Sequence, residues 1–361
     1  MAHADAVTPE VTLVEGSDPA LARAATNMDA LRASELTRTV DGVLWVIEMT
    51  EPSRPGVRQI GLGGMARTDE IRTPATPMGP IIRNEGVREK KARGRADLIE
   101  RTSAIVGTVN NAVDDVTGGF KAALERYADS MVCDLEVEDE QGTRHRIWLV
   151  GDGGEVAALQ ELLAAEPRAY VADGNHRSAA AAMLGYADFL SVFFPADTME
   201  IKPYNRLVDV HPDGSGGDLR QIEVAFVMRE LDGVEAYQPV DSDRIGLYSG
   251  GRWFELMPKA GTFDGADAAE SIAAGVIQRN LFGAVLGIPD ARDARLRFVG
   301  NNRDAHYLRD QVDSGEYGYA VTLPAVTMRE FIDVCLQDRL MPPKSTWFEP
   351  KLRSGLVVAL L

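Results

Sequence analysis

Residues 169–185 read AYVADGNHRSAAAAMLG and carry the most informative pattern of the chain. The apolar start predicts a short strand, and the alanine-rich second half predicts a helix. A tight polar turn between them brings four residues to the start of that helix: Gly174, Asn175, His176 and Arg177. Unpaired N–H groups and a partial positive charge make a helix N-terminus attractive to anions, so this turn predicts a phosphate site. Asp173, at the end of the strand, is placed to hold a metal ion beside it.

A capped strand–helix junction is the alternative interpretation of the same stretch. Asp173 or Asn175 would then be the N-cap of the helix, and Gly185 would be its C-terminal stop. Capping accounts for one acid or one amide but leaves the neighbouring histidine and arginine unexplained. Because convergent polar groups mark functional sites, we favour the functional interpretation.

The composition is that of an ordinary globular protein, with 361 residues, 45% of them hydrophobic and 26% charged. This length predicts one large or two medium domains, and we favour two. The glycine-rich stretch at 213–218 predicts a boundary that divides the chain into residues 1–216 and 217–361. No run is apolar enough to span a membrane, and residues 1–5 lack the features of a signal peptide. With Cys133 and Cys335 as the only cysteines, we expect a cytoplasmic protein with reduced thiols.

The formal net charge of −17 argues against a nucleic-acid partner, because it repels a phosphate backbone. One basic cluster lies between residues 83 and 101, and its members are Arg83, Arg88, Lys90, Lys91, Arg93, Arg95 and Arg101. Such a run is usually a solvated helix face. It is also suited to attract a polyanionic small molecule such as a nucleotide.

Apolar patterns predict a core of mixed α and β structure. In the first half we expect a hairpin of strands 43–49 and 57–65, a helix at 88–105, strands at 130–137 and 145–150, and a helix at 155–165. In the second half we expect strands at 223–229, 244–247, 252–256 and 296–299, and helices at 268–286, 303–312 and 328–337.

A second unusual motif, MPPKSTWFEPKL, occupies residues 341–352. Its small polar and basic groups suit phosphate binding, and these are Lys344, Ser345 and Thr346. Trp347 and Phe348 offer faces on which an aromatic base could stack. A C-terminal tail anchored in the core by these aromatic rings is an equally good interpretation of the residues alone.

Both motifs resemble a bacterial family known as domain of unknown function 1015. Its members carry an Ala-Asp-Gly-His-His-Arg turn and a Met-Pro-Pro-Lys-Ser-Thr-x-Phe-x-Pro-Lys-Leu element, and the resemblance extends over residues 43–361. Two positions depart from the family pattern, because Asn84 and Asn175 stand where the family has histidines. Asparagine keeps hydrogen bonding but carries neither a proton nor a positive charge.

The turn is also similar to that of the archaeal free serine kinases, which have a ParB/sulfiredoxin-like fold. The resemblance implies an α+β protein with a mixed-sheet nucleotide-binding core and a C-terminal α+β region whose tail returns to the active-site cleft. It implies that Asp173 coordinates Mg²⁺, that Glu85 is the base acting on a hydroxyl, and that phosphates are held by Gly174, Asn175, His176 and Arg177. His176 is thereby also placed among the catalytic residues. Position 175 is not a cysteine, which excludes sulfiredoxin chemistry.

The implied activity is a nucleotide- and Mg²⁺-dependent kinase that phosphorylates the hydroxyl of a small metabolite. Free L-serine or a similar amino acid is the first candidate acceptor, and ATP or ADP is the donor. The alternative is a non-catalytic regulator that binds a nucleotide or metabolite on the same fold. If one anion site serves both motifs, residues 344–346 face the turn at 173–177 across one cleft.

Overall fold

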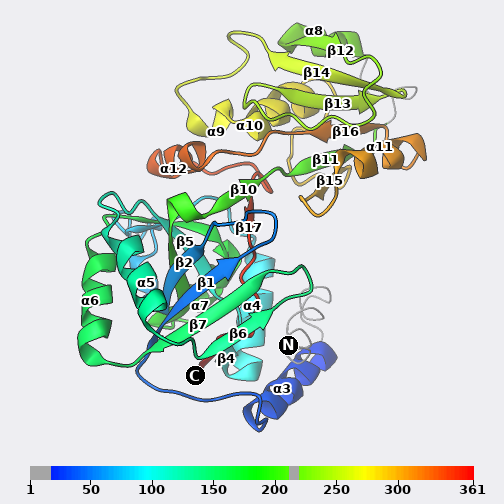
Figure 1. Ribbon diagram of the computed structural model, residues 1–361. Coiled ribbons are helices and arrows are strands. Elements are labelled where there is room, and N and C mark those ends of the chain that lie inside the picture. Colours follow the sequence, from blue (N-terminus) through cyan, green and yellow to red (C-terminus); the bar gives the residue numbers. More distant parts are fainter. Residues whose placement is uncertain (1–17, 211–218) are drawn as a thin grey trace. The chain divides into compact units, whose positions relative to one another are not determined.

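The computed structural model describes residues 18–210 and 219–361, and it divides into two compact units (Figure 1). Unit 1 comprises the chain up to Met199 together with Pro350–Leu361, and unit 2 comprises Glu200–Glu349. The chain therefore passes from unit 1 into unit 2 and back. The boundary predicted between residues 216 and 217 lies in the segment 211–218, outside the described residues.

Unit 1 is built on a mixed sheet of eight strands in the order β3-β8-β5-β9-β2-β1-β7-β6. In that order the strands are Ile81–Arg83, Ala169–Asp173, Val109–Val113, Asp188–Pro195, Gln59–Arg67, Leu44–Thr50, Arg144–Val150 and Leu135–Glu138. The pairs β3–β8 and β5–β9 are parallel, and the other pairs of neighbours in this sheet are antiparallel. The expected mixed sheet and the expected hairpin of β1 and β2 are confirmed.

The helices of unit 1 are α3 (Asp18–Arg32), α4 (Glu89–Thr102), α5 (Gly119–Ser130), α6 (Gly153–Ala164) and α7 (Asn175–Met183), with short turns η1 (Thr68–Glu70) and η2 (Ala196–Thr198). In the main core, Phe120 of α5 and Leu159 of α6 pack with strand residues such as Trp148. A smaller core joins α3 to α4 through Met28 and Leu98. The strand expected at 130–137 begins only at Leu135, because Ser130 belongs to α5 and residues 131–134 form an irregular connection.

The end of the chain is part of unit 1. Strand β18 (Ala359–Leu360) pairs antiparallel with β4 (Ala104–Ile105), which directly follows α4. Arg353 Nε donates to Asp139 Oδ2 at 2.7 Å, and His145 Nε2 lies 3.1 Å from the same oxygen. Burial works to raise the pKa of Asp139, but the bonds from Arg353 and His145 outweigh it and lower that pKa to about 2.

The buried His145 predicts a pH dependence of stability. Its side chain is 0% exposed, and burial lowers its pKa below 6.5 against the opposing effect of Asp139. A depressed folded pKa means that the stabilisation is present above the unfolded pKa and is lost as pH falls through the folded value. We expect the urea midpoint of the wild type to fall between pH 7 and pH 5 more steeply than that of His145→Gln, whose amide still donates to Asp139. Urea midpoints that change equally with pH in the two proteins would contradict this prediction.

Unit 2 contains an antiparallel sheet of six strands in the order β12-β14-β13-β16-β11-β15. In that order the strands are Phe226–Glu230, Arg252–Pro258, Ile245–Ser249, Tyr319–Thr322, Asn205–Val208 and Leu296–Val299. A separate two-stranded ladder pairs β10 (Glu200–Lys202) with β17 (Trp347–Glu349). The helices are α8 (Leu219–Ala225), α9 (Ala268–Ser271), α10 (Ala273–Ile277), the π-helical turn η3 (Gln278–Gly283), α11 (Ala305–Asp313) and α12 (Met328–Leu336). The strand expected at 223–229 begins only at Phe226, because α8 takes its first residues.

The single helix expected at 268–286 is instead broken at Ile272, whose backbone is extended with ψ 148°. The break brings Gly275 so close to Ala269 that a Cβ at position 275 would lie 2.2 Å from the Ala269 carbonyl oxygen. Asp267 caps α9 by accepting the N–H groups of Ala269 and Glu270. The corner therefore depends on a glycine and a cap that helical periodicity does not reveal.

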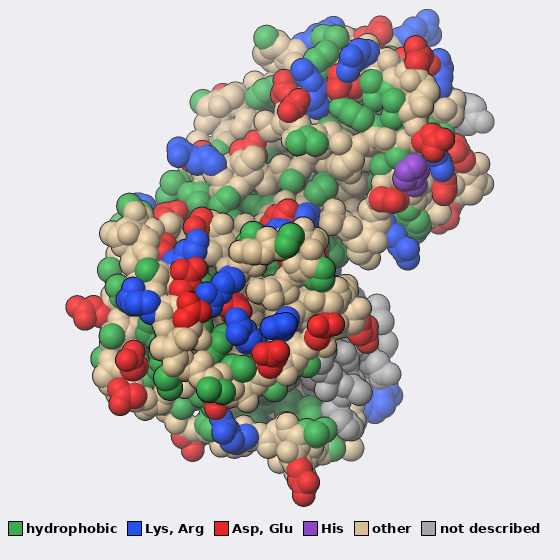
Figure 2. Space-filling model, viewed as in Figure 1, with side chains coloured by type: hydrophobic (Ala, Val, Ile, Leu, Met, Phe, Trp, Pro, Cys, Tyr) green, Lys and Arg blue, Asp and Glu red, His purple; other side chains and the backbone are tan. Residues whose placement is uncertain are grey.

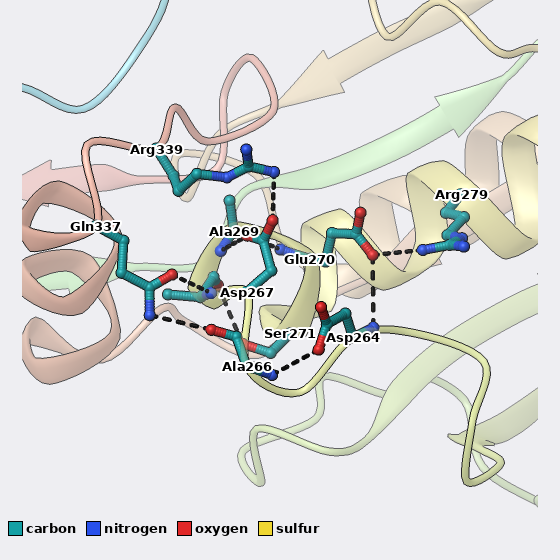
Figure 3. A network of polar contacts seen from close by, with 10 residues as sticks. Asp264, Ala266, Asp267, Ala269, Glu270, Ser271, Arg279, Gln337 and Arg339 are labelled. Atoms are coloured by element: carbon teal, nitrogen blue, oxygen red, sulfur yellow. Dashed lines mark hydrogen bonds and ion pairs between the residues drawn. The ribbon is translucent and has the colours of Figure 1, made fainter.

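Polar contacts hold this corner in place (Figure 3). Gln337, which follows α12, donates to the Ala266 carbonyl at 3.1 Å and accepts the Ala268 N–H at 2.9 Å. Arg339 pairs with Asp267 in the same network. Since these contacts satisfy backbone and side-chain groups within unit 2, we assign the network a structural role.

On the face drawn in Figure 2, acidic and basic side chains are interspersed over each unit rather than gathered by sign. Of the helices in residues 18–210 and 219–361, none is long and apolar enough to cross a membrane.

Candidate functional site

The expected strand, turn and helix at 169–185 are confirmed as β8, Gly174 and α7. Gly174 is the N-cap of α7, so neither Asp173 nor Asn175 has the N-cap position considered above. The expected stop at Gly185 is confirmed by its left-handed φ of +71° just after the helix. The Arg177 N–H donates to the Gly174 carbonyl at 2.8 Å, so the N–H groups of Asn175 and His176, which precede it, are the candidate donors to an anion.

Gly174 is required by its backbone and by its surroundings. Its φ is +112°, which L side chains rarely adopt. A Cβ at this position would lie 3.1 Å from Val109 Cα and 3.0 Å from Arg177 Nε. The turn can therefore form this closely against β5 only with glycine.

We expect Gly174→Ala to destabilise unit 1 more than Gly185→Ala does. Both glycines have positive φ, but a Cβ at Gly185 would meet nothing within 4 Å. Both substitutions place a Cβ on a residue of positive φ, at a backbone cost of about 1–2 kcal/mol, and the one at Gly174 adds the close contacts with Val109 and Arg177. Urea unfolding of both variants measures the difference, and equal midpoints would contradict the crowding at Gly174.

Glu85 and Asp173 lie at the carboxyl ends of two neighbouring parallel strands. Strands β3 and β8 pair in register with Arg83 opposite Val171. Asp173 is the last residue of β8, and Glu85 follows the end of β3 by two residues, past a bend at Asn84. Because the two strands are parallel neighbours, both carboxylates lie at the same edge of the sheet. Glu85 is partly buried and therefore retains access to solvent.

Asp173 has an unexpected neighbour in Asn110. The two residues pair across β5 and β8, next to an irregularity in the register that leaves Ala172 without a partner. Such bulges re-aim side chains and are common beside active sites. Asn110 is only 6% exposed, and its Oδ1 has no hydrogen-bond partner among the described residues. A carboxylate and an orphaned amide oxygen thus lie on adjacent strands.

Asp173 interacts electrostatically with two arginines. Arg177 Nη2 forms an ion pair with Asp173 Oδ2 at 2.7 Å. Its side chain passes over Gly107 and Gly174, where added Cβ atoms would lie 2.9 Å and 3.0 Å from its atoms. Burial is the main effect that lowers the pKa of Arg95 in α4. The charges of Arg177 and Asp173 also act on this guanidinium. The site therefore concentrates positive charge where the turn offers its N–H groups.

The side chains of Asn175 and His176 connect α7 to the segment that carries Glu85. Asn175 Nδ2 donates to Asn84 Oδ1 at 2.8 Å, and both residues are buried. His176 Nε2 accepts the backbone N–H of Arg88 at 3.1 Å, just before α4 begins. The two positions that depart from the family's histidines are thus in direct contact. The sequence predicts that Asn175 and His176 bind phosphate, and this role stays a prediction.

Sequence reasoning missed Asn110 as part of the site, and it named Asn84 only as a departure from the family pattern without foreseeing its contact with Asn175. The signal for Asn110 was present, because Asn110 and Asn111 interrupt an otherwise apolar strand. Asn111 donates to Ser191 Oγ within the sheet, and its own Oδ1 is also buried without a hydrogen-bond partner among the described residues; Asn110 is the one of the two that pairs with Asp173. Two adjacent polar residues inside an otherwise apolar strand therefore indicate a candidate site.

The C-terminal motif forms a turn in unit 2. Ser345 Oγ donates to the Pro342 carbonyl at 2.7 Å, and the exposed Lys344 has Nζ 5.6 Å from the Tyr204 ring centroid. The Trp347 ring packs edge-on against Tyr204 at 5.3 Å, and Phe348 packs against Phe331 at 5.2 Å. Both aromatic residues thus have anchoring contacts in unit 2. The roles predicted for Lys344, Ser345 and Thr346 in nucleotide binding stay predictions.

A family model described as "Protein of unknown function (DUF1015)" matches residues 6–281. Solved structures that match the chain include free serine kinase in complex with AMP, 11% identical, with 79% of this chain and 86% of that chain covered and a TM-score of 0.42. A variant of free serine kinase in complex with ADP is 12% identical, with 83% and 92% covered and a TM-score of 0.43. A conserved hypothetical protein from Pyrococcus furiosus is 11% identical, with 82% and 95% covered and a TM-score of 0.42.

No curated protein matches the chain. Identities and TM-scores this low do not assign an activity, and the ParB/sulfiredoxin-like assignment stays a prediction. The family model is different, because it spans more than half of the 361 residues. The chain therefore belongs to the family described as protein of unknown function (DUF1015).

Proposed function

We propose that this protein is a nucleotide- and Mg²⁺-dependent kinase that phosphorylates a hydroxyl group of a small metabolite. The observation that carries the proposal is that Glu85 and Asp173 lie at the carboxyl ends of neighbouring parallel strands, at the edge of the sheet where α7 begins. Phosphoryl transfer requires positioning, neutralisation of phosphate charge and a group that accepts the hydroxyl proton. The ends of β3 and β8 offer residues for each of these tasks.

The phosphates of the nucleotide would bind at the start of α7. The N-cap of this helix is a glycine, and the N–H groups of Asn175 and His176 would contact the phosphates. Arg177 and Arg95 lie beside this point and add positive charge. Ion pairing between Arg177 and Asp173 holds the guanidinium in place before a nucleotide arrives.

The residues around Asp173 fit a Mg²⁺ ion that is shared with phosphates. The described residues contain no cluster of three or more His, Cys, Asp or Glu residues that could hold a metal alone. Mg²⁺ usually takes one or two carboxylates and completes its shell with phosphates and water. Asp173 would supply the carboxylate, and the unpartnered Oδ1 of Asn110 would supply a second oxygen. The bound ion would neutralise charge on the phosphate oxygens.

Glu85 would accept the proton of the attacking hydroxyl. Its place at the end of β3 is fixed by the pairing with β8 and by the bond from Asn175 to Asn84. His176 would act through its bond to the Arg88 N–H, which positions the segment between Glu85 and α4. Free L-serine or a similar amino acid is the first candidate acceptor.

Phosphorus NMR of the protein with Mg²⁺, ATP or ADP and a panel of amino acids tests this proposal. We expect a new phosphomonoester signal that depends on one acceptor and on Mg²⁺. Nucleotide binding with no phosphorylated product from any acceptor would instead favour the non-catalytic regulator. The charge of −17 supports a small-molecule partner rather than nucleic acid, and the cytoplasmic location stays a prediction.

A further inference from the structure

Arg83 is an arginine of this region with no function assigned so far. It is the last residue of β3, and its Nε donates to Ser178 Oγ in α7 at 3.3 Å. Ser178 is 0% exposed, so the guanidinium extends into a buried environment. The Nη2 atom of Arg83 is buried and has no hydrogen-bond partner among residues 18–210 and 219–361.

This arrangement is costly without a ligand. Burial lowers the pKa of Arg83, and no carboxylate offsets that effect. A partly buried cation without a counter-ion loses hydration that nothing replaces, which makes such groups rare outside functional sites. The hydroxyl of Ser178 is a neutral acceptor and leaves the positive charge uncompensated. An anion supplied by a ligand would remove this penalty.

The position of Arg83 indicates which ligand supplies the anion. Only Asn84 separates it from Glu85, and two residues of extended chain span at most about 7 Å. A small molecule could therefore place an acidic group on Arg83 and a hydroxyl on Glu85 at the same time. Arg177 and Arg95, by contrast, lie at Asp173, where the nucleotide phosphates are proposed to bind.

We propose that Arg83 binds the carboxylate of the acceptor and thereby selects hydroxy acids over neutral alcohols. This inference rests on the proposed kinase function for the role of Glu85, but the binding of an anion at Arg83 stands on the guanidinium itself. Bidentate hydrogen bonding to a carboxylate is the contact that a guanidinium forms best. Arg83 is then a specificity-determining residue of the acceptor site.

Calorimetric titration with hydroxy acids and their carboxamides tests the inference without requiring turnover. The probes are L-serine, L-threonine and L-homoserine, each paired with its amide, added in the presence of Mg²⁺ and ADP. We expect the wild type to prefer at least one acid over its amide by tenfold or more, and Arg83→Gln to lose that preference. Arg83→Lys keeps the positive charge but loses the parallel N–H donors of the guanidinium. We therefore expect its ratio of acid to amide affinity to lie between those of the wild type and Arg83→Gln.

Arg168→Gln is the matched control, because it removes the same charge from an exposed position just before β8, at the opposite end of that strand. We expect it to leave the acid-to-amide ratio unchanged. Thermal unfolding excludes a folding defect, since removing an unpaired buried cation should preserve or raise the melting temperature of the free protein.

Three outcomes would overturn the inference: no acid binds to the wild type, the ratio survives Arg83→Gln, or Arg83→Gln weakens ADP binding rather than acid binding. The last result would make Arg83 a phosphate ligand. If acids bind through Arg83 but none is phosphorylated, the inference stands and the proposed kinase activity fails.

Discussion

Replacing Glu85 by glutamine is expected to lower turnover by about 10²- to 10⁴-fold and to leave nucleotide affinity nearly unchanged. Glutamine keeps the size and hydrogen bonding of the side chain but cannot accept a proton from the acceptor. Glu85 follows the last paired residues of β3 and lies outside the α7 turn that is proposed to bind phosphates. Binding and chemistry should therefore separate, with kcat reduced and the nucleotide Kd preserved.

Glu89→Gln is the control for that variant. Glu89 is exposed in the first turn of α4, four residues after Glu85. The Glu89→Gln variant should turn over at close to the parental rate. Parental turnover in Glu85→Gln would show that Glu85 is not the base, and Glu89 and Asp97 would become the next carboxylates to test.

Replacing Asp173 by asparagine is expected to weaken nucleotide binding about tenfold or more when Mg²⁺ is present, a change of about 1.4 kcal/mol or more. The variant loses a charged oxygen ligand for a hard cation. When Mg²⁺ is chelated, the same substitution should not weaken nucleotide binding, because Arg177 loses its ion pair with Asp173 and becomes more available to phosphate. Affinity without the metal should therefore stay constant or rise.

Titration calorimetry of Asp173→Asn with and without Mg²⁺ measures this difference, and Arg177→Gln is the matched control. The control removes the other half of the same ion pair and should weaken binding in both conditions. Equal affinity of Asp173→Asn and the wild type in both conditions would reduce Asp173 to a residue that only holds Arg177.

Local features of the site were predictable from the sequence. The apolar run before Asp173, the glycine after it and the alanine-rich helix specify a strand, a left-handed turn and a helix through local preferences alone. The candidate base Glu85 came from resemblance, since no local pattern links it to the turn. Its place beside Asp173 depends on the parallel pairing of β3 with β8, which residues distant in sequence determine.

The failures have physical causes as well. Helical periodicity over 268–286 is real, but the close approach of Gly275 to Ala269 and the cap at Asp267 bend the chain into separate helices. The contact between Asn84 and Asn175 was equally hidden, because each side chain is buried only by the pairing of their elements. Tertiary contacts of this kind override local preference.

Paramagnetic broadening by Mn²⁺ tests most directly whether the ends of β3 and β8 bind a metal–nucleotide complex. Mn²⁺ accepts the same oxygen ligands as Mg²⁺, and its unpaired electrons broaden amide signals nearby. In the ¹⁵N-labelled protein with ADP, we predict that Mn²⁺ broadens the signals of residues 173–177, Asn110 and Glu85 first, relative to a sample with Mg²⁺. Unchanged signals at these positions, with broadening centred elsewhere in the chain, would contradict the assignment of the site.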